Sequence, residues 1–209
     1  GALATAVLVD RLLTSVPGSA AAGAAVGGRG GMTAAAAFSP ELLANWPQFR
    51  GPGGNGIAVR QDPPVEWDGA SGKNIAWKVE VPLPGKNSPV VWDDRVFLSG
   101  ADASGREVFC WDTATGALRW RTSIPTGAAA EGIRVTDDTG HAASTMAVDG
   151  KAVYAAFATG DLVALDLEGR ILWSRTFGVP EMNYGYGSSL ALLGDLLLVQ
   201  LDQLEGGRL

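Results

Sequence analysis

The sequence has little cysteine, histidine or basic charge. Its 209 residues include one Cys and one His, and 16 Lys and Arg stand against 22 Asp and Glu, which gives a net charge of −6. One cysteine excludes an internal disulfide, and Cys110 with His141 is too small a set for a zinc site. Cys110 lies in an apolar run, so we expect it to be a small buried hydrophobe. The basic residues form no cluster, which excludes a nucleic-acid partner because binding phosphates requires a basic face.

Motifs for nucleophilic, nucleotide or metal chemistry are also missing. Gly-x-Ser-x-Gly does not occur, and no Ser or Cys nucleophile is spaced to partner His141. Residues Gly51–Gly56 match G-x-G-x-x-G formally, but no strand precedes them and Pro63-Pro64 prevents the helix that would hold a phosphate. We therefore expect a structural glycine-rich loop. Asp93-Asp94 sits in an expected hairpin turn and Asp137-Asp138 has no third ligand spaced nearby, so we expect no metal site.

Residues 1–44 differ in composition from the rest of the chain. Residues 1–13 are apolar but too short to span a bilayer, and residues 19–37 are rich in Ala and Gly. Two interpretations stay open: the end of an export signal or membrane anchor, or a disordered low-complexity leader. Ser39 and Pro40 predict a short helix over residues 39–43. We expect the folded domain over residues 45–209, and we expect a fragment, because the sequence begins with Gly and its last residues resemble the start of another strand.

A hairpin pattern occurs three times between residues 88 and 198. Each copy has a short apolar strand, a tight turn and a second apolar strand, over Ser88–Leu98, Ser144–Tyr154 and Ser188–Leu198. The turns carry Asp93-Asp94, Asp149-Gly150 and Gly194-Asp195, which are residue types that tolerate positive φ in two-residue hairpin loops.

A second hairpin with a closing tryptophan follows each of the first two copies, over Cys110–Trp120 and Ala164–Trp173. A looser half-copy ends at Trp77, with residues 68–73 as its turn. One period is thus four short strands in about 40–55 residues, which is typical of a propeller blade. The fold class is therefore predicted to be an all-β propeller of four-stranded antiparallel blades. We expect seven or eight blades in a complete ring and parts of three to four here.

The pattern Asp-x-x-Thr-Gly-x-x-x-Trp at Asp112–Trp120 resembles the tryptophan-docking repeat of the pyrroloquinoline-quinone (PQQ) repeat family. Asp166–Trp173 resembles a copy shortened at its turn, and Asp68–Trp77 a looser one. The segment Trp46–Pro52 resembles the start of many uncharacterised bacterial propellers of this class. That family contains quinoprotein alcohol and glucose dehydrogenases as well as the non-catalytic BamB-type lipoproteins of outer-membrane assembly.

The resemblance implies structural roles for the repeat residues. The tryptophans are expected to dock on the neighbouring blade, the glycines to take the positive-φ turn position, and Asp and Thr to hydrogen-bond the turn. These residues are Asp112, Thr115, Gly116, Trp120, Asp166, Gly169, Trp173 and Trp77. None of these roles is catalytic.

Three functions remain open on this resemblance. The first is a non-catalytic scaffold or interaction module of the bacterial cell envelope, in the periplasm or exported. It would have protein partners, no cofactor, and membrane contact only through an N-terminal signal or anchor. The alternative is the N-terminal part of a PQQ-dependent dehydrogenase, in which case PQQ would be the cofactor. A single Cys cannot supply the vicinal cysteine pair of those enzymes, which favours the scaffold. A ligand-binding propeller, or one attached to another catalytic domain, is a third option.

The parts that differ between copies are the loops that lead into each first hairpin. If the first strand of each blade lines the axis, these loops lie at the mouth of the channel. We call residues 85–87, 126–143 and 178–187 the lead-in loops, and we expect a binding surface on them. Its candidate residues are Lys86, Asn87, Glu131, Arg134, His141, Asn183, Tyr184 and Tyr186. Solvated loop residues are the alternative interpretation.

Overall fold

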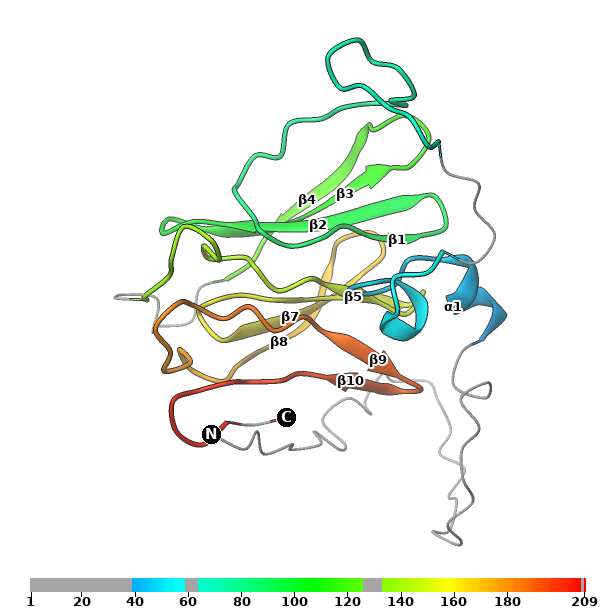
Figure 1. The fold of residues 1–209 in the computed structure, drawn as a ribbon. Coiled ribbons are helices and arrows are strands. Elements are labelled where there is room, and N and C mark those ends of the chain that lie inside the picture. Colours follow the sequence, from blue (N-terminus) through cyan, green and yellow to red (C-terminus); the bar gives the residue numbers. More distant parts are fainter. Residues whose placement is uncertain (1–38, 59–63, 126–132, 208) are drawn as a thin grey trace, which may run out of the picture.

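The computed structural model describes residues 39–58, 64–125, 133–207 and 209 (Figure 1). One short helix, α1 (Pro40–Ala44), opens this part of the chain. Ser39 caps α1, since its hydroxyl accepts a hydrogen bond from the Leu42 amide at 3.1 Å, and Pro40 occupies the first turn. The predicted helix is confirmed. A single 3₁₀ turn, η2 (Pro52–Gly54), follows within the glycine-rich segment.

Within the described residues, ten strands form three antiparallel sheets. The first sheet consists of β1 (Val90–Trp92), β2 (Arg95–Ala101), β3 (Arg106–Asp112) and β4 (Leu118–Ser123) in that order. The second sheet repeats this order with β5 (Ala147–Val148), β6 (Ala152–Ala156), β7 (Asp161–Asp166) and β8 (Ile171–Thr176). The third sheet is a hairpin of β9 (Ala191–Leu193) and β10 (Leu196–Leu198). The predicted hairpins and four-stranded repeats are confirmed.

Positive φ angles form the tight turns between the first two strands of each sheet. Asp93, Gly150 and Gly194 have φ of 50°, 83° and 58° respectively. Aspartate and glycine are the residue types that accept this conformation at lowest cost, so the local sequence determines where each hairpin reverses.

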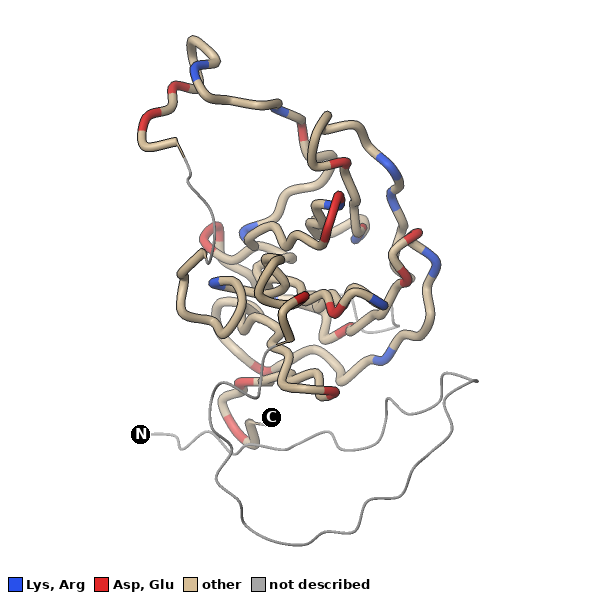
Figure 2. The backbone as a smooth tube through the Cα atoms, turned by 90° about the vertical axis from the view of Figure 1, so that its right-hand side faces the viewer, with Lys and Arg blue, Asp and Glu red and all other residues tan. Residues whose placement is uncertain are grey.

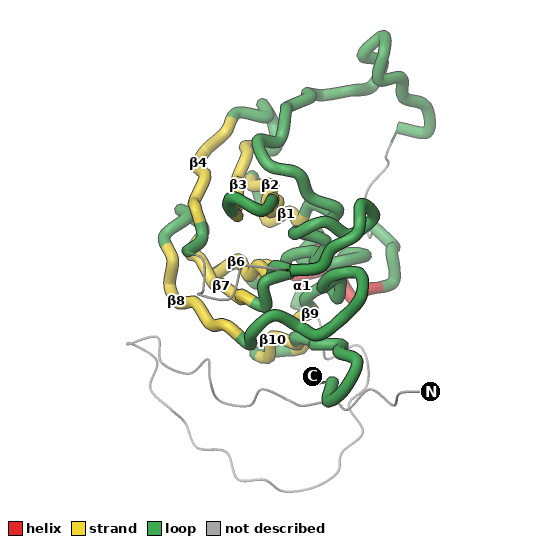
Figure 3. Tube along the Cα trace, turned by 90° about the vertical axis from the view of Figure 1, so that its left-hand side faces the viewer, coloured by secondary structure: helices red, strands yellow, loops and turns green. Residues whose placement is uncertain are grey.

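Burial distinguishes the inner strands from the outer ones. β3 and β7 are buried along almost their whole length, whereas β4 and β8 are mostly exposed. β4 and β8 run along one rim of the molecule (Figure 3). The innermost strands lie next to one another, with β1 in contact with β5 and β5 in contact with β9. The sheets thus stack face to face around their inner strands, which is the arrangement of propeller blades.

The core fills the spaces between successive sheets. Phe97, Val108 and Cys110 of the first sheet meet Val153 and Leu165 of the second in one buried cluster. A second cluster joins the second and third sheets. Cys110 is fully buried, and this burial raises the pKa of its thiol to about 12. It is a small core residue, as expected.

The predicted half-copy around Trp77 differs from a blade fragment. Its turn forms, with Asp68 bridged to Lys73 and the Asp68 carboxylate accepting bonds from the Ala70 and Ser71 amides at 2.9 and 3.2 Å. Among the described residues, no strand precedes β1. A blade needs a first hairpin on which its outer strands pair, and the described part of the chain contains no such hairpin before β1. The expected sheet is therefore absent among the described residues around Trp77.

Candidate functional site

Trp120, the closing tryptophan of the first sheet, joins that sheet to the second. The Trp120 indole N–H donates to the Leu167 carbonyl at 2.8 Å, and the Thr122 hydroxyl donates to the Gly169 carbonyl at 2.7 Å. A Cβ at Gly169 would lie 2.6 Å from Cδ2 of the Trp120 ring, and Gly169 has φ of 85°. Only glycine meets both requirements, which are a left-handed backbone and a ring seated directly on it.

The same contact occurs one repeat earlier. The Trp77 indole N–H donates to the Thr113 carbonyl at 2.7 Å, and a Cβ at Gly116 would lie 2.7 Å from the Trp77 ring. Trp173, in the corresponding position of the second sheet, packs 6.1 Å from the Tyr154 ring at the second core cluster. The Trp77 and Trp120 contacts therefore run from one repeat to the turn of the next, whereas Trp173 packs on Tyr154 of its own sheet.

Aspartates organise the turns on which the tryptophans dock. Asp112 Oδ1 accepts bonds from the Ala114 amide, the Thr115 amide and the Thr115 hydroxyl at 2.9–3.0 Å. Asp166 Oδ1 accepts from the Glu168 and Arg170 amides at 3.1 and 2.8 Å. A carboxylate therefore satisfies the backbone donors of both turns, including the shorter one.

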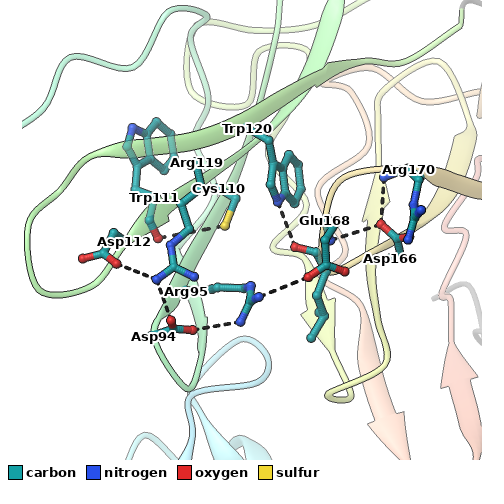
Figure 4. A network of polar contacts seen from close by, with 11 residues as sticks. Asp94, Arg95, Cys110, Trp111, Asp112, Arg119, Trp120, Asp166, Glu168 and Arg170 are labelled. Carbon is teal, nitrogen blue, oxygen red and sulfur yellow. Dashed lines mark hydrogen bonds and ion pairs between the residues drawn. The ribbon is translucent and has the colours of Figure 1, made fainter.

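Ion pairs link these turns into a network (Figure 4). The Arg119 guanidinium contacts both Asp94 and Asp112 at 2.5 Å, and Arg95 contacts Asp94 at 2.8 Å and Glu168 of the second sheet at 3.1 Å. The Arg119 hydrogen bond, followed by that from Thr115, lowers the pKa of Asp112 to about 2. These side chains connect the turns at the ends of two sheets, through the Arg95–Glu168 pair.

A buried ion pair lies at the opposite ends of the same sheets. Arg106 and Asp161 meet at 2.8 Å with side chains 5% and 9% exposed, and the Thr159 hydroxyl donates to the same carboxylate oxygen at 2.6 Å. Burial lowers the pKa of Arg106, although the Asp161 charge opposes that shift. Sequence reasoning missed this pair, because two isolated charges 55 residues apart carry no local pattern.

The lead-in loops lie against one another. The Lys86 amide donates to the Ala142 carbonyl at 2.9 Å, and the Asn87 side-chain amide donates to both the Ala142 and Ser99 carbonyls at 2.8 Å. The Thr139 hydroxyl donates to the Tyr184 carbonyl, joining the second loop to the third. Hydrogen bonds thus join the described part of the second lead-in loop to both the first and the third.

The candidate residues differ in their exposure. Lys86, Arg134, Asn183 and Tyr184 are exposed, and Tyr184 is 56% exposed. Asn87 and His141 are half-buried.

Tyr186 is a correction to the predicted surface, because it is 1% exposed. Gly185 has φ of 90°, so this turn of the chain leaves Tyr184 at the surface while Tyr186 enters the second core cluster. Glu131 lies outside the described residues.

Hydroxyl groups join the starts of the three first strands. The Ser88 amide donates to the Thr145 hydroxyl at 3.0 Å, and the Thr145 amide donates to the Ser189 hydroxyl at 3.2 Å. The Ser144 hydroxyl donates to the Ser188 carbonyl at 2.8 Å. The serines that begin each hairpin pattern therefore connect neighbouring sheets beneath the lead-in loops.

A basic group with stacked aromatic rings is the combination that suits an anionic quinone. Arg106 is paired with Asp161, and the cation–aromatic contact of the described part, Arg175 over Trp173 at 6.0 Å, lies on the outer strand β8. Across the described ranges, no three His, Cys, Asp or Glu side chains gather closely enough to hold a metal.

Charge and hydropathy add two observations. Figure 2 shows Lys and Arg interspersed with Asp and Glu along the backbone. Within the ranges that the structure covers, no helix has the length and apolar character needed to cross a membrane.

Stacked four-stranded antiparallel sheets, with the tryptophan of one repeat docked on the turn of the next, define a β-propeller. Residues 46–185 match the family model described as "Outer membrane protein assembly factor BamB". The match covers more than half of the sequence, so the chain belongs to this family of PQQ-repeat propellers. The predicted family resemblance and fold class are confirmed.

Solved structures similar to this chain come from both branches of the family. BamB from Moraxella catarrhalis is 21% identical over 48% of this chain and 26% of its own, with a TM-score of 0.36. A europium-containing methanol dehydrogenase is 16% identical over 61% and 22%, with a TM-score of 0.45. Quinohemoprotein alcohol dehydrogenase from Comamonas testosteroni is 21% identical over 58% and 18%, with a TM-score of 0.45. The chain thus spans about a quarter or less of each structure, and no curated protein matches it.

Proposed function

We propose that this chain is part of a non-catalytic propeller scaffold of the bacterial cell envelope. It binds a protein partner through the lead-in loops and supports the assembly of outer-membrane proteins. Membership of the BamB family supports this proposal. In this account the protein is exported to the periplasm and needs no cofactor.

One contrast between the two ends of the sheets carries the proposal. At the turn end, several of the repeat's charged and aromatic side chains contact the neighbouring sheet, as in Arg95 to Glu168 and Trp120 to Leu167. At the other end, the exposed side chains of Lys86, Arg134 and Tyr184 make no hydrogen bond to another described residue. A mixed basic and aromatic surface of this kind suits protein recognition, since Tyr and Arg are enriched where interfaces bind most strongly.

The experiment is deletion of the gene in its own bacterium, followed by measurement of folded outer-membrane β-barrel proteins by heat-modifiable gel mobility. We expect the deletion to lower their level and the wild-type gene to restore it. Arg134→Glu combined with Tyr184→Ala is expected not to restore it. Lys151→Glu is the matched control, because Lys151 is exposed at the β5–β6 turn, away from the lead-in loops. Unchanged levels after deletion contradict the assembly function, and full restoration by the double variant contradicts the proposed surface.

The quinoprotein alternative makes a different prediction for the purified full-length protein. When PQQ and Ca²⁺ are added, a dehydrogenase retains the cofactor and reduces an artificial electron-acceptor dye with a primary alcohol. Our proposal predicts neither retention nor dye reduction. Alcohol-dependent dye reduction at stoichiometric PQQ would reassign the chain to the enzymatic branch of the family.

A further inference from the structure

The segment Asn45–Gln48, which we call the clasp, crosses the inner ends of all three sheets. Trp46 forms an antiparallel bridge with Val91 of β1, with N···O distances of 3.1 and 2.8 Å. The Pro47 carbonyl accepts a hydrogen bond from the Val148 amide of β5 at 2.8 Å. The Gln48 side-chain carbonyl accepts one from the Leu192 amide of β9 at 2.7 Å. Three consecutive residues thus reach three successive sheets.

The strands that bond the clasp are edge strands of their sheets. Within the sheets, β1, β5 and β9 each pair with a single neighbour, and they lie next to one another, so the clasp meets the edges that face the centre of the stack. The clasp supplies partners for amides on these edges. The clasp itself is flanked by α1 on one side and by the turn at Gly51 on the other. The Trp46 ring packs directly on Gly51, since a Cβ added at Gly51 would lie 2.6 Å from that ring.

Burial shows that the clasp is part of the core and not a surface strand. Pro47 is buried, and Gln48 is 6% exposed. A buried glutamine keeps its place only when its polar atoms are paired, so its bond to β9 accounts for a polar residue at this position. Gln48 lies 144 residues from Leu192 in sequence, so no local sequence pattern predicts this contact.

We infer that the clasp is a built-in device that holds the third sheet in place against the first two, and that Gln48 is the residue through which it acts on β9. The clasp and α1 lie at the end of the sheets that carries the β9–β10 turn, opposite the lead-in loops (Figure 1). Weakening the clasp is therefore expected to loosen the third sheet while the proposed binding surface stays intact. This inference does not depend on the proposed function.

Amide hydrogen exchange on the full chain, read at single residues, tests the clasp. Gln48→Met keeps the length of the side chain and removes its acceptor. We expect exchange of the Leu192 amide and of the β9–β10 hairpin to become roughly five- to tenfold faster, because one buried hydrogen bond is lost. Exchange in β2 and β3 of the first sheet is expected to stay the same. Gln48→Glu retains an acceptor oxygen and should preserve protection at Leu192.

Gln200→Met is the matched control, since the Gln200 side chain follows the same hairpin but bonds only to Asp202, at 3.0 Å. It should leave the Leu192 amide unchanged. The inference is overturned if Gln48→Met leaves exchange at Leu192 unchanged. It is overturned equally if all three sheets lose protection together, since Gln48 would then be a general core residue and not the link to β9.

Discussion

Replacing Gly169 with alanine tests whether tryptophan docking holds successive sheets together. The substitution adds one methyl group at a position with φ of 85°, and that methyl lies 2.6 Å from Cδ2 and 2.7 Å from Cε3 of Trp120. Real side-chain carbons do not approach a ring so closely, so either the ring or the turn must move. Movement of the ring lengthens the 2.8 Å hydrogen bond from Trp120 to Leu167.

The expected cost has two parts. A left-handed alanine costs about 1–2 kcal/mol relative to glycine. Overpacking a filled contact adds about 1–3 kcal/mol. Gly169→Ala should therefore lower the free energy of unfolding by roughly 2–5 kcal/mol. Gly178 is the control that isolates the backbone contribution from the overpacking contribution. It has φ of 80°, and a methyl group added there would have no atom within 4 Å. Gly178→Ala should thus lose only about 1–2 kcal/mol.

Urea denaturation followed by far-ultraviolet circular dichroism measures both variants. A double-mutant cycle with Trp120→Ala completes the assay, because removal of the ring should reduce the cost of Gly169→Ala to about that of Gly178→Ala. The reasoning is refuted if Gly169→Ala costs no more than Gly178→Ala. It is refuted as well if the cost of Gly169→Ala is the same with and without the Trp120 ring.

The charges and the thiol lead to three further predictions. The pKa of Asp112 is about 2 in the folded chain, against an ordinary 3.8. The unfolded state therefore takes up the proton first as the pH falls, and stability is lost between about pH 4 and pH 2. Asp112→Asn should flatten that part of a pH–stability profile. The pKa of Cys110 is about 12, so a thiol reagent at pH 8 should label it only after denaturation, and rapid labelling of the folded chain would contradict its burial. Asp161→Asn leaves the buried Arg106 without its charged partner. It should lower the free energy of unfolding, measured by urea denaturation, by about 3–5 kcal/mol, which is more than the loss on replacing both residues with methionine.

The repeats made the fold predictable from sequence. Each hairpin combines short apolar strands with a turn residue that accepts positive φ, such as Gly150 at 83°, so local chemistry determines the strand order. The family resemblance also led us to expect that tryptophans dock between repeats, and in the structure Trp77 lies against Gly116 and Trp120 against Gly169. Patterns of this kind lie within one period of the sequence and can be read without coordinates.

Contacts between distant segments could not be read in this way. The Arg106–Asp161 pair and the Gln48–Leu192 bond join residues that are 55 and 144 positions apart, and neither belongs to the repeat. Tyr186 shows a second limit. Two tyrosines flank Gly185 in the same loop, yet the positive φ at Gly185 leaves one at the surface and the other 1% exposed. The sequence predicted the loop correctly, but only the packing of the chain decides which ring is available to a partner.

Site-specific photo-cross-linking in the living cell tests the central claim most directly. A photoreactive amino acid is placed at position 184 in the lead-in loops of the full-length protein, or at position 151 in the β5–β6 turn as a control. We expect a cross-link from position 184, and not from position 151, to a protein that assembles outer-membrane β-barrels. Cross-links to such a protein from position 151 alone, or from neither position, would contradict a binding surface on the lead-in loops.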